Sequence, residues 1–257
     1  MKVFSFERRN LVAVFTLNRP EKSNAVTPDL MREMEAAMME FMEDDALRVG
    51  IITGAGEKAF CSGADIAEWL PFVKQTADRP WRIPDTPMRG MYVTKPLIAA
   101  VNGIAFGGGA EIALACDFRI ASENAAFRFP EPSLGILPRL GGTQRLPRLI
   151  GRARAMEILL TNQKVDAQTA LSIGLVSRVV KQEELMDAAM ELAQKICTLA
   201  PLAVTAIKRC VCEGCELPLE RGLALENEIG LTLYQTEDYE EGRAAFREKR
   251  APRFKGK

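Results

Sequence analysis

The stretch Asn102-Gly-Ile-Ala-Phe-Gly-Gly-Gly-Ala-Glu111 follows an apolar run and leads into a second apolar segment. Its three adjacent glycines end near a carboxylate, so it could be a flexible joint, a phosphate cradle or a place where backbone N–H groups meet a reacting atom. Glycine lets an N–H group stand clear of side chains, and a helix that begins after such a turn adds its positive dipole end. The phosphate interpretation is disfavoured because the stretch lacks the Lys and Ser/Thr of a P-loop.

A second segment of this kind is Ala59-Phe-Cys-Ser-Gly-Ala-Asp65, which also follows an apolar run. Two such segments predict a convergent pair of N–H groups, an oxyanion hole that stabilises negative charge on a carbonyl oxygen. Glu111 heads the helix predicted after the glycines, and Glu131 follows the strand predicted at 126–129. Both emerge from apolar surroundings, where desolvation raises a carboxyl pKa toward the range useful for proton transfer. For Glu111 alone, compensation of the helix dipole is the alternative.

The sequence contains no histidine. Ser-His-Asp and Cys-His catalysis, histidine-ligated zinc and imidazole acid–base chemistry are therefore excluded. Proton transfer near neutral pH must come from carboxylates, Lys, Tyr or Cys with shifted pKa values. A carboxylate pair beside backbone dipoles is one of the few arrangements left for proton transfer next to a carbonyl group.

Composition bounds the class of protein. The chain has 257 residues, 47% of them hydrophobic, so it can bury a large core. Lys+Arg and Asp+Glu both number 34 and no basic stripe is present, so we expect no nucleic-acid or membrane partner. Charges interrupt the N-terminus, and no apolar run reaches the ~18 residues of a membrane span, which predicts a soluble, cytoplasmic protein.

Hydrophobic patterning predicts an α/β core followed by a helical region. Thr27 and Pro28 are expected to cap and open a helix, and short apolar runs predict strands at 12–17, 49–53, 97–101 and 126–129. From residue 182 onward the pattern is helical, with breaks at Pro201, 214–218 and Thr236. We therefore expect an α/β core over residues 1–190 and a helical region over residues 191–257.

The Pro-rich segment 69–95 carries both tryptophans and has no sustained period. It predicts a loop with short helical pieces, which is either a pocket wall or a surface insertion. Trp69, Phe72 and Trp81 suggest a bulky or ring-shaped ligand group, unless they pack on the outer surface.

A glycine pattern of another kind lies at Gly54, Gly56 and Ala59, which fit G-x-G-x-x-A after a strand. Dinucleotide binding would require a helix to start there, but Phe60-Cys-Ser-Gly63 interrupts at once. A dinucleotide-dependent oxidoreductase is therefore a weak alternative.

Three of the six cysteines cluster at Cys210, Cys212 and Cys215. Clustered thiolates can hold zinc or an iron–sulfur cluster, but a fourth ligand is missing nearby. Ordinary helix and turn cysteines are the preferred interpretation, and no metal site is predicted.

Five motifs occur in order along the chain: RPEKSNAV (19–26), AFCSGADI (59–66), NGIAFGGGAEIALACD (102–117), FPEPSLGILPRLGGTQRLPRLIG (129–151) and ALSIGLVSRVV (170–180). Together they closely resemble the crotonase, or enoyl-CoA hydratase/isomerase, superfamily, and the resemblance covers almost the whole chain. It implies an α/β fold built as a spiral of repeated β-β-α turns. It also implies a C-terminal helical subdomain that packs between subunits in homotrimers, often paired as homohexamers.

The resemblance implies roles for individual residues. The backbone N–H groups of Ser62, where the family often has alanine, and of Gly108 match the oxyanion-hole donors that bind a CoA thioester carbonyl. Glu111 and Glu131 match the two catalytic glutamates of the enoyl-CoA hydratases. The positions expected to contact the substrate and its CoA moiety are Lys22, Ala25, Ser62, Gly63, Ala64, Asp65, Ile66 and Gly108.

The implied function is that of an enoyl-CoA hydratase, a hydro-lyase of acyl-CoA metabolism such as β-oxidation. It would reversibly add water, with syn geometry, across the 2,3 double bond of a 2-enoyl-CoA to give a 3-hydroxyacyl-CoA. Glu111 would act as base on the water and Glu131 would deliver a proton to the α-carbon. No metal or redox cofactor is implied, because coenzyme A is part of the substrate.

Other reactions on the same scaffold remain open. Within the superfamily, the alternatives are a carnitinyl-CoA-type dehydratase, a cyclic dienoyl-CoA hydratase and an enoyl-CoA isomerase. A non-catalytic RNA-binding protein is disfavoured by the balanced charge and by the intact glutamate pair.

Overall fold

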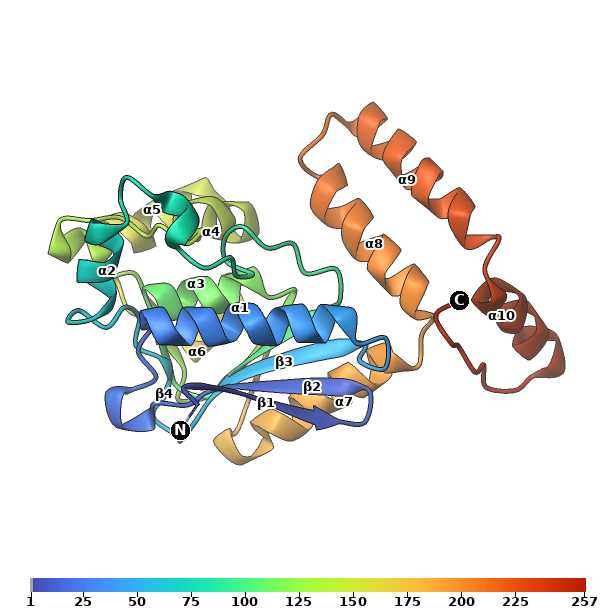
Figure 1. Ribbon diagram of the computed structural model, residues 1–257, viewed down its shortest axis with the longest axis horizontal. Coiled ribbons are helices and arrows are strands. Elements are labelled where there is room, and N and C mark those ends of the chain that lie inside the picture. The colour runs from blue at the N-terminus through green and yellow to red at the C-terminus, as the bar shows by residue number, and fades with distance from the viewer. Residues whose placement is uncertain (1) are drawn as a thin grey trace.

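Two β-sheets form the centre of the computed structural model, which describes residues 2–257 (Figure 1). The first sheet contains, in spatial order, β1 (Phe4–Arg9), β2 (Val12–Leu17), β3 (Val49–Gly54), β5 (Leu97–Val101), β7 (Phe118–Ser122) and β10 (Arg178–Val180). The second contains β4 (Ala59–Cys61), β6 (Ile104–Phe106), β8 (Ala126–Arg128) and β9 (Val165–Asp166). Neighbouring strands are parallel, except that β1 pairs antiparallel with β2 and β8 with β9.

The chain winds as a spiral because successive strands alternate between the two sheets. β3, β5 and β7 lie in the first sheet, and each is followed within a few residues by β4, β6 or β8 of the second. Helical segments then return the chain to the first sheet, as parallel pairing requires. They include α2 (Trp69–Gln75), α3 (Gly108–Ala115), α4 (Gly142–Ile150), α5 (Arg152–Thr161) and α6 (Ala167–Ser172). This arrangement confirms the expected α/β spiral of β-β-α turns.

Helices cover both faces of the first sheet. α1 (Pro28–Glu43) begins as predicted, with Pro28 in its first turn and the Thr27 hydroxyl accepting the Leu30 N–H at 3.1 Å. Its buried methionine stripe packs in the same core as Phe15 of β2, whereas Val14 of that strand belongs to a second core. Alternate residues of a strand point to opposite faces, so the two cores lie on opposite sides of the sheet.

The second core fixes where the α/β unit ends. Helix α7 (Leu185–Cys197) contributes Ala189, Ala193 and Cys197 to it, against strands of the first sheet. The boundary predicted at residue 190 therefore falls inside a helix that belongs to the α/β core. The packing places the boundary after Cys197 instead, because the whole buried face of α7 lies on the sheet.

The remaining helices form an arm that extends away from the sheets, with α8 and α9 side by side (Figure 1). They are α8 (Pro201–Gly214), α9 (Leu219–Leu233) and α10 (Glu237–Glu248), separated at the predicted breaks. No residue of α8 or α9 is buried. Lys208 ties α8 to the core, since its ammonium group donates to the Asp117 carboxylate at 2.7 Å and to the Lys95 carbonyl at 2.9 Å. Across residues 2–257, every helix is too short or too polar to cross a membrane.

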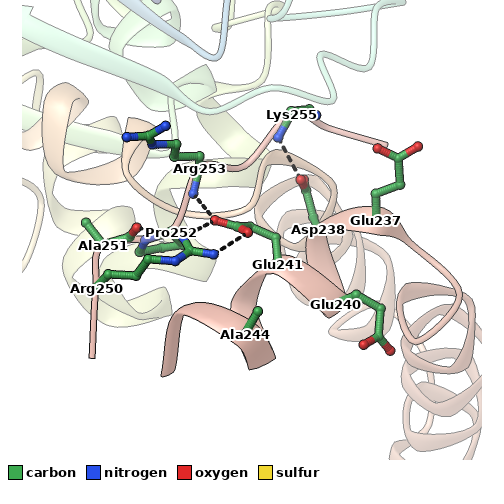
Figure 2. A pocket seen from close by; sticks show the side chains of 10 residues that line it. All are labelled: Glu237, Asp238, Glu240, Glu241, Ala244, Arg250, Ala251, Pro252, Arg253 and Lys255. Atoms are coloured by element: carbon green, nitrogen blue, oxygen red, sulfur yellow. Dashed lines mark hydrogen bonds and ion pairs between the residues drawn. The ribbon is translucent and has the colours of Figure 1, made fainter. Parts of the chain in front are cut away.

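The C-terminal tail folds back on α10, where two carboxylates hold it (Figure 2). Asp238 is buried and accepts the backbone N–H groups of Lys255 at 2.6 Å and Gly256 at 2.8 Å. Glu241 accepts the Arg253 N–H at 2.7 Å and two bonds from the Arg250 guanidinium, which lowers the pKa of Glu241 to about 2. The cavity between tail and helix, about 950 Å³, is lined mainly by these charged residues. The tail is thus an ordered part of the arm.

Candidate active site

The three glycines that open α3 each meet a different constraint. Gly107 has a φ of 50°, and a Cβ there would lie 2.7 Å from the Glu131 Oε1 atom. A Cβ on Gly109 would lie 2.1 Å from the carbonyl oxygen of Cys61, so the helix can approach β4 only without a side chain at this position. Between them, the Gly108 N–H is the first of the helix and has no intrahelical acceptor. The flexible-joint interpretation is therefore wrong, because the stretch is tightly packed.

A second free N–H group, that of Ala64, lies close to Gly108. A Cβ on Gly108 would be 4.0 Å from the Ala64 nitrogen, and both residues line the same cavity. Neither N–H has an acceptor among residues 2–257. The two groups are therefore available together to a single carbonyl oxygen.

The expectation that Ser62 supplies the first donor is wrong. Its N–H donates to the Ser23 carbonyl at 2.9 Å, which leaves it unavailable to a substrate. The Val26 N–H donates to the Gly63 carbonyl at 2.7 Å and the Asp65 N–H to the Val26 carbonyl at 2.8 Å. This parallel bridge uses the Gly63 carbonyl and the Asp65 N–H, and it leaves the Ala64 N–H free. The donor thus lies two residues beyond the predicted one.

Asn24 holds the loop that makes this bridge, and sequence reasoning missed it. Its fully buried amide donates to the carbonyls of Ala55 at 3.0 Å and Ala59 at 2.8 Å and accepts the Arg19 N–H at 2.9 Å. Its backbone has a φ of 55°, a conformation that Asn tolerates better than most residues. The sequence signal for this role is the position of Asn24 in the motif RPEKSNAV, shortly before the helix cap Thr27.

Glu111 lies in the first turn of α3 with 2% of its surface exposed. Its Oε1 atom accepts the backbone N–H groups of Leu140 and Gly142, both at 2.8 Å. Burial raises the pKa of Glu111, and these two hydrogen bonds together with the charge of Arg145 act in the opposite direction. The bonds orient the carboxylate and stabilise its ionised form, as a general base requires.

Glu131 opens the 3-10 turn η3 (Glu131–Leu134), directly after β8 and Pro130. It is 9% exposed, and its Oε2 atom is buried without a hydrogen-bond partner among residues 2–257. Burial raises the pKa of Glu131 to about 7, and repulsion from Glu111 adds to the effect. The two carboxyl groups thus differ in environment, which favours a proton on Glu131 and a charge on Glu111.

A cavity of about 320 Å³ opens beside the two glutamates. Its apolar walls come mainly from two segments, 69–95 and 134–140, with Val26 and Ala64 beside them. The two segments contribute Trp69, Leu70, Val73, Ala77, Ile83, Ile136, Leu137 and Leu140. The segment 69–95 is therefore a pocket wall, with the expected short helical pieces α2 and η2 (Pro80–Arg82). Of the aromatic residues singled out above, Trp69 lines the cavity, Phe72 packs against Trp69, and Trp81 is 76% exposed.

Arg145 joins the two wall segments, and no local pattern of residues indicates this role. Its guanidinium donates to the carbonyls of Met88 at 2.9 Å and Pro87 at 3.2 Å, and also to that of Leu140 at 3.0 Å. Leu140 in turn donates its N–H to Glu111. Arg145 therefore positions both the wall segment and the loop that orients the carboxylate.

The other positions expected along the CoA path fall into two groups. Lys22 and Ile66 are exposed and accessible to a ligand. Asp65 instead pairs with Arg19 at 3.3 Å, and the Ala25 carbonyl accepts from the same guanidinium at 3.2 Å. The Asp65 carboxylate and the Ala25 carbonyl are therefore engaged with Arg19, which holds the shape of the loop.

The G-x-G-x-x-A pattern at 54–59 and the cysteine cluster at 210–215 form ordinary turns and helix. After Gly54 the chain enters β4 through a short turn, so no helix begins where a dinucleotide site would need one. The cysteine cluster lies at the end of α8, where Cys212 and Cys215 are exposed. Within the described residues 2–257, no group of three or more His, Cys, Asp or Glu side chains is arranged to hold a metal ion.

Comparisons with known proteins show to which family the chain belongs. The enoyl-CoA hydratase/isomerase family profile matches residues 7–257. The (E)-benzylidenesuccinyl-CoA hydratase of Thauera aromatica is 44% identical over 98% of both chains, and the short-chain-enoyl-CoA hydratase of Clostridium acetobutylicum is 44% identical over 95% of this chain and 94% of its own. The crystal structure of an enoyl-CoA hydratase from Bacillus anthracis superimposes with a TM-score of 0.94 at 40% identity, covering 99% of this chain and 100% of the other. The chain therefore belongs to the enoyl-CoA hydratase/isomerase family.

Proposed function

We propose that this protein is an enoyl-CoA hydratase, a hydro-lyase that reversibly adds water across the 2,3 double bond of a 2-enoyl-CoA. The observation that carries the proposal is the pairing of Glu111 and Glu131 on one cavity with the free N–H groups of Ala64 and Gly108. Relatives at 44% identity carry hydratase names, which supports the same reaction. Coenzyme A enters as part of the substrate, and the proposed reaction uses no metal or redox cofactor.

In the proposed reaction, the thioester carbonyl oxygen accepts hydrogen bonds from the N–H groups of Ala64 and Gly108. These bonds strengthen as negative charge moves onto that oxygen, so they stabilise the enolate-like transition state more than the substrate. The short distance from the Gly108 Cβ position to the Ala64 nitrogen and the common cavity of the two residues support this placement.

The two glutamates then divide the proton transfers. Glu111 takes a proton from water as the oxygen adds to the β-carbon, and Glu131 gives its proton to the α-carbon. The raised pKa of Glu131, about 7, and the two N–H donors to Glu111 support this division. The starting protonation state returns when Glu111 loses its proton and Glu131 gains one from solvent.

We also propose that the protein assembles as a homotrimer or as a pair of trimers. Apolar side chains are exposed along the arm, among them Ile207 at 64%, Leu219 at 75% and Phe246 at 86%. Helices α8 and α9 bury none of their residues in a single chain, so a neighbouring subunit would supply the missing contacts. A cytoplasmic location is proposed on the basis of six free cysteine thiols, which suit a reducing compartment.

The test follows the ultraviolet absorbance of the conjugated enoyl thioester. Adding the protein to crotonyl-CoA, to a longer enoyl-CoA and to a cyclic enoyl-CoA should bleach at least one of them. Glu131→Gln should lower kcat by about 10²-fold or more while leaving acyl-CoA binding measurable by titration calorimetry. Glu123→Gln is the matched control, because Glu123 is exposed and lies outside the cavity. Full turnover by Glu131→Gln would overturn the mechanism.

A further inference from the structure

Three cationic side chains line the cavity beside the glutamate pair: Lys74, Arg89 and Arg139. Within residues 2–257, none of these three side chains forms a hydrogen bond or an ion pair. The neighbouring Arg145 differs, since its guanidinium is occupied by three backbone carbonyls. The charge of the three cations is therefore not needed to hold the fold together.

The acids on the cavity wall do not balance this charge. Only Glu111 and Glu131 contribute carboxyl groups to the lining. Because the pKa of Glu131 is about 7, that residue carries only about half a negative charge at neutral pH. Glu111 is committed to the N–H groups of Leu140 and Gly142. The cavity thus carries an excess of positive charge.

The cations share the cavity with an apolar surface. Trp69, Val73 and Leu137 represent the aliphatic and aromatic walls that a hydrocarbon chain would contact. A volume of about 320 Å³ holds roughly ten non-hydrogen atoms, if each occupies the ~30 Å³ share of a water molecule in the liquid. Lys74, Arg89 and Arg139 are exposed to solvent as well as lining the cavity, and a purely aliphatic acyl group would offer none of them a partner.

We propose that the acyl group of the substrate is a short apolar stem that ends in a carboxylate, which Lys74, Arg89 and Arg139 bind. The inference rests on the proposed hydratase function, because it names the substrate class of that same site. Arginine offers paired N–H donors that match a carboxylate, and a flexible lysine adds a third contact.

The phosphates of coenzyme A are the competing source of negative charge. The accessible residues expected along the CoA path, Lys22 and Ile66, do not line this cavity. Ala64 and Gly108, which do line it, would hold the thioester carbonyl where the acyl group joins the CoA moiety. The cations line the same cavity as these two N–H groups, so a carboxylate at the end of a short acyl chain would share that cavity with them.

The experiment compares two substrates of equal chain length, 2-hexenoyl-CoA and 5-carboxy-2-pentenoyl-CoA, which differ by a methyl group against a carboxylate. We expect a higher kcat/KM for the carboxylated substrate, and added salt should reduce the preference. Arg139→Gln should lower the ratio of the two kcat/KM values by about 10-fold, and the triple variant with Lys74→Gln and Arg89→Gln by more. Arg82→Gln is the matched control, because Arg82 is an exposed arginine of the same wall segment that does not line the cavity.

Two results would overturn the proposal. The first is a higher kcat/KM of the wild type for 2-hexenoyl-CoA, with a ratio of the two kcat/KM values that Arg139→Gln does not change. The other is an equal rise in KM for both substrates, which would assign the cations to the CoA phosphates. If neither substrate reacts, the hydratase function fails first, and calorimetry with the saturated analogues hexanoyl-CoA and 5-carboxypentanoyl-CoA still decides the carboxylate question. Tighter binding of the carboxylated analogue would support it, and equal binding would overturn it.

Discussion

The environment of Glu131 predicts that this residue lowers the stability of the protein at neutral and alkaline pH. Burial raises its pKa to about 7, against an ordinary value of 4.5, and its Oε2 atom has no partner within residues 2–257. Between these two pH values the folded chain keeps a proton that the unfolded chain has lost. The free energy of unfolding therefore falls as pH rises through this window, and above about pH 7 the whole penalty is present.

The pKa difference sets the size of the effect. A pKa difference of this size corresponds to about 3 kcal/mol across the full window, since each pH unit is worth about 1.4 kcal/mol. Between about pH 5.5 and about pH 8.5, where the protein is easier to handle, the change is about 2 kcal/mol. Glu131→Gln removes the titrating group while keeping its shape. Between these two pH values, the free energy of unfolding of Glu131→Gln should therefore change by about 2 kcal/mol less than that of the wild type. The variant should also lose activity.

Urea unfolding of both proteins at the two pH values, at one fixed protein concentration, measures the difference. Subtracting the pH dependence of the variant from that of the wild type cancels the titration of every group that does not interact with Glu131. After this subtraction, the free energy of unfolding of the wild type should fall by about 2 kcal/mol from the lower to the higher pH. Parallel pH dependences would refute the assignment of a raised pKa to Glu131.

Three further predictions concern the other parts of the site. Glu111→Gln should reduce hydration by about 10²-fold or more in a stopped absorbance assay while acyl-CoA binding persists, and unchanged turnover would remove Glu111 from the mechanism. Gly109→Ala should destabilise the fold by about 3 kcal/mol or more in thermal or urea unfolding, because the new Cβ would lie 2.1 Å from the Cys61 carbonyl oxygen. Gly214→Ala is its control: the nearest atom to the new Cβ is 3.8 Å away, so we expect no loss and a gain of up to about 1 kcal/mol. Asn24→Ala removes three hydrogen bonds of a buried amide, to the carbonyls of Ala55 and Ala59 and from the Arg19 N–H, and should cost about 2–4 kcal/mol. A midpoint within error of the wild type would contradict this.

Local chemistry was enough to predict the elements of the core. Thr27 caps α1 by accepting a hydrogen bond from Leu30, three residues later, and Pro28 is the first residue of the helix. The runs at 12–17 and 97–101 are strands with the predicted bounds. The free N–H group at the glycines before Glu111 could also be predicted, because a free N–H at a helix start depends only on neighbouring residues. β1 was not expected, since its outward-facing charges hide a strand that pairs only with β2.

Features that depend on distant partners could not be predicted. Ser62 and Ala64 have equivalent backbone groups in the sequence, and only the contacts with Ser23 and Val26 decide which N–H is free. The helix that contains residue 190 looks like its helical neighbours along the chain, but its alanine face meets a sheet formed by strands far away in sequence. Arg145 likewise has no local signal, because all its carbonyl partners except Leu140 lie in the segment 69–95.

The contacts of Arg145 bear on how this enzyme scaffold can change its specificity. One guanidinium joins Met88 and Pro87 of the pocket wall to Leu140, which in turn donates its N–H to Glu111. A chimera that exchanges segment 69–95 for that of a relative must therefore present carbonyl groups at the positions of Met88 and Pro87. Otherwise, the exchange alters the setting of the carboxylate together with the shape of the pocket. An exchange of the whole segment thus changes substrate range and catalytic rate together. Changes of the side chains that face the cavity can alter substrate range without moving Glu111.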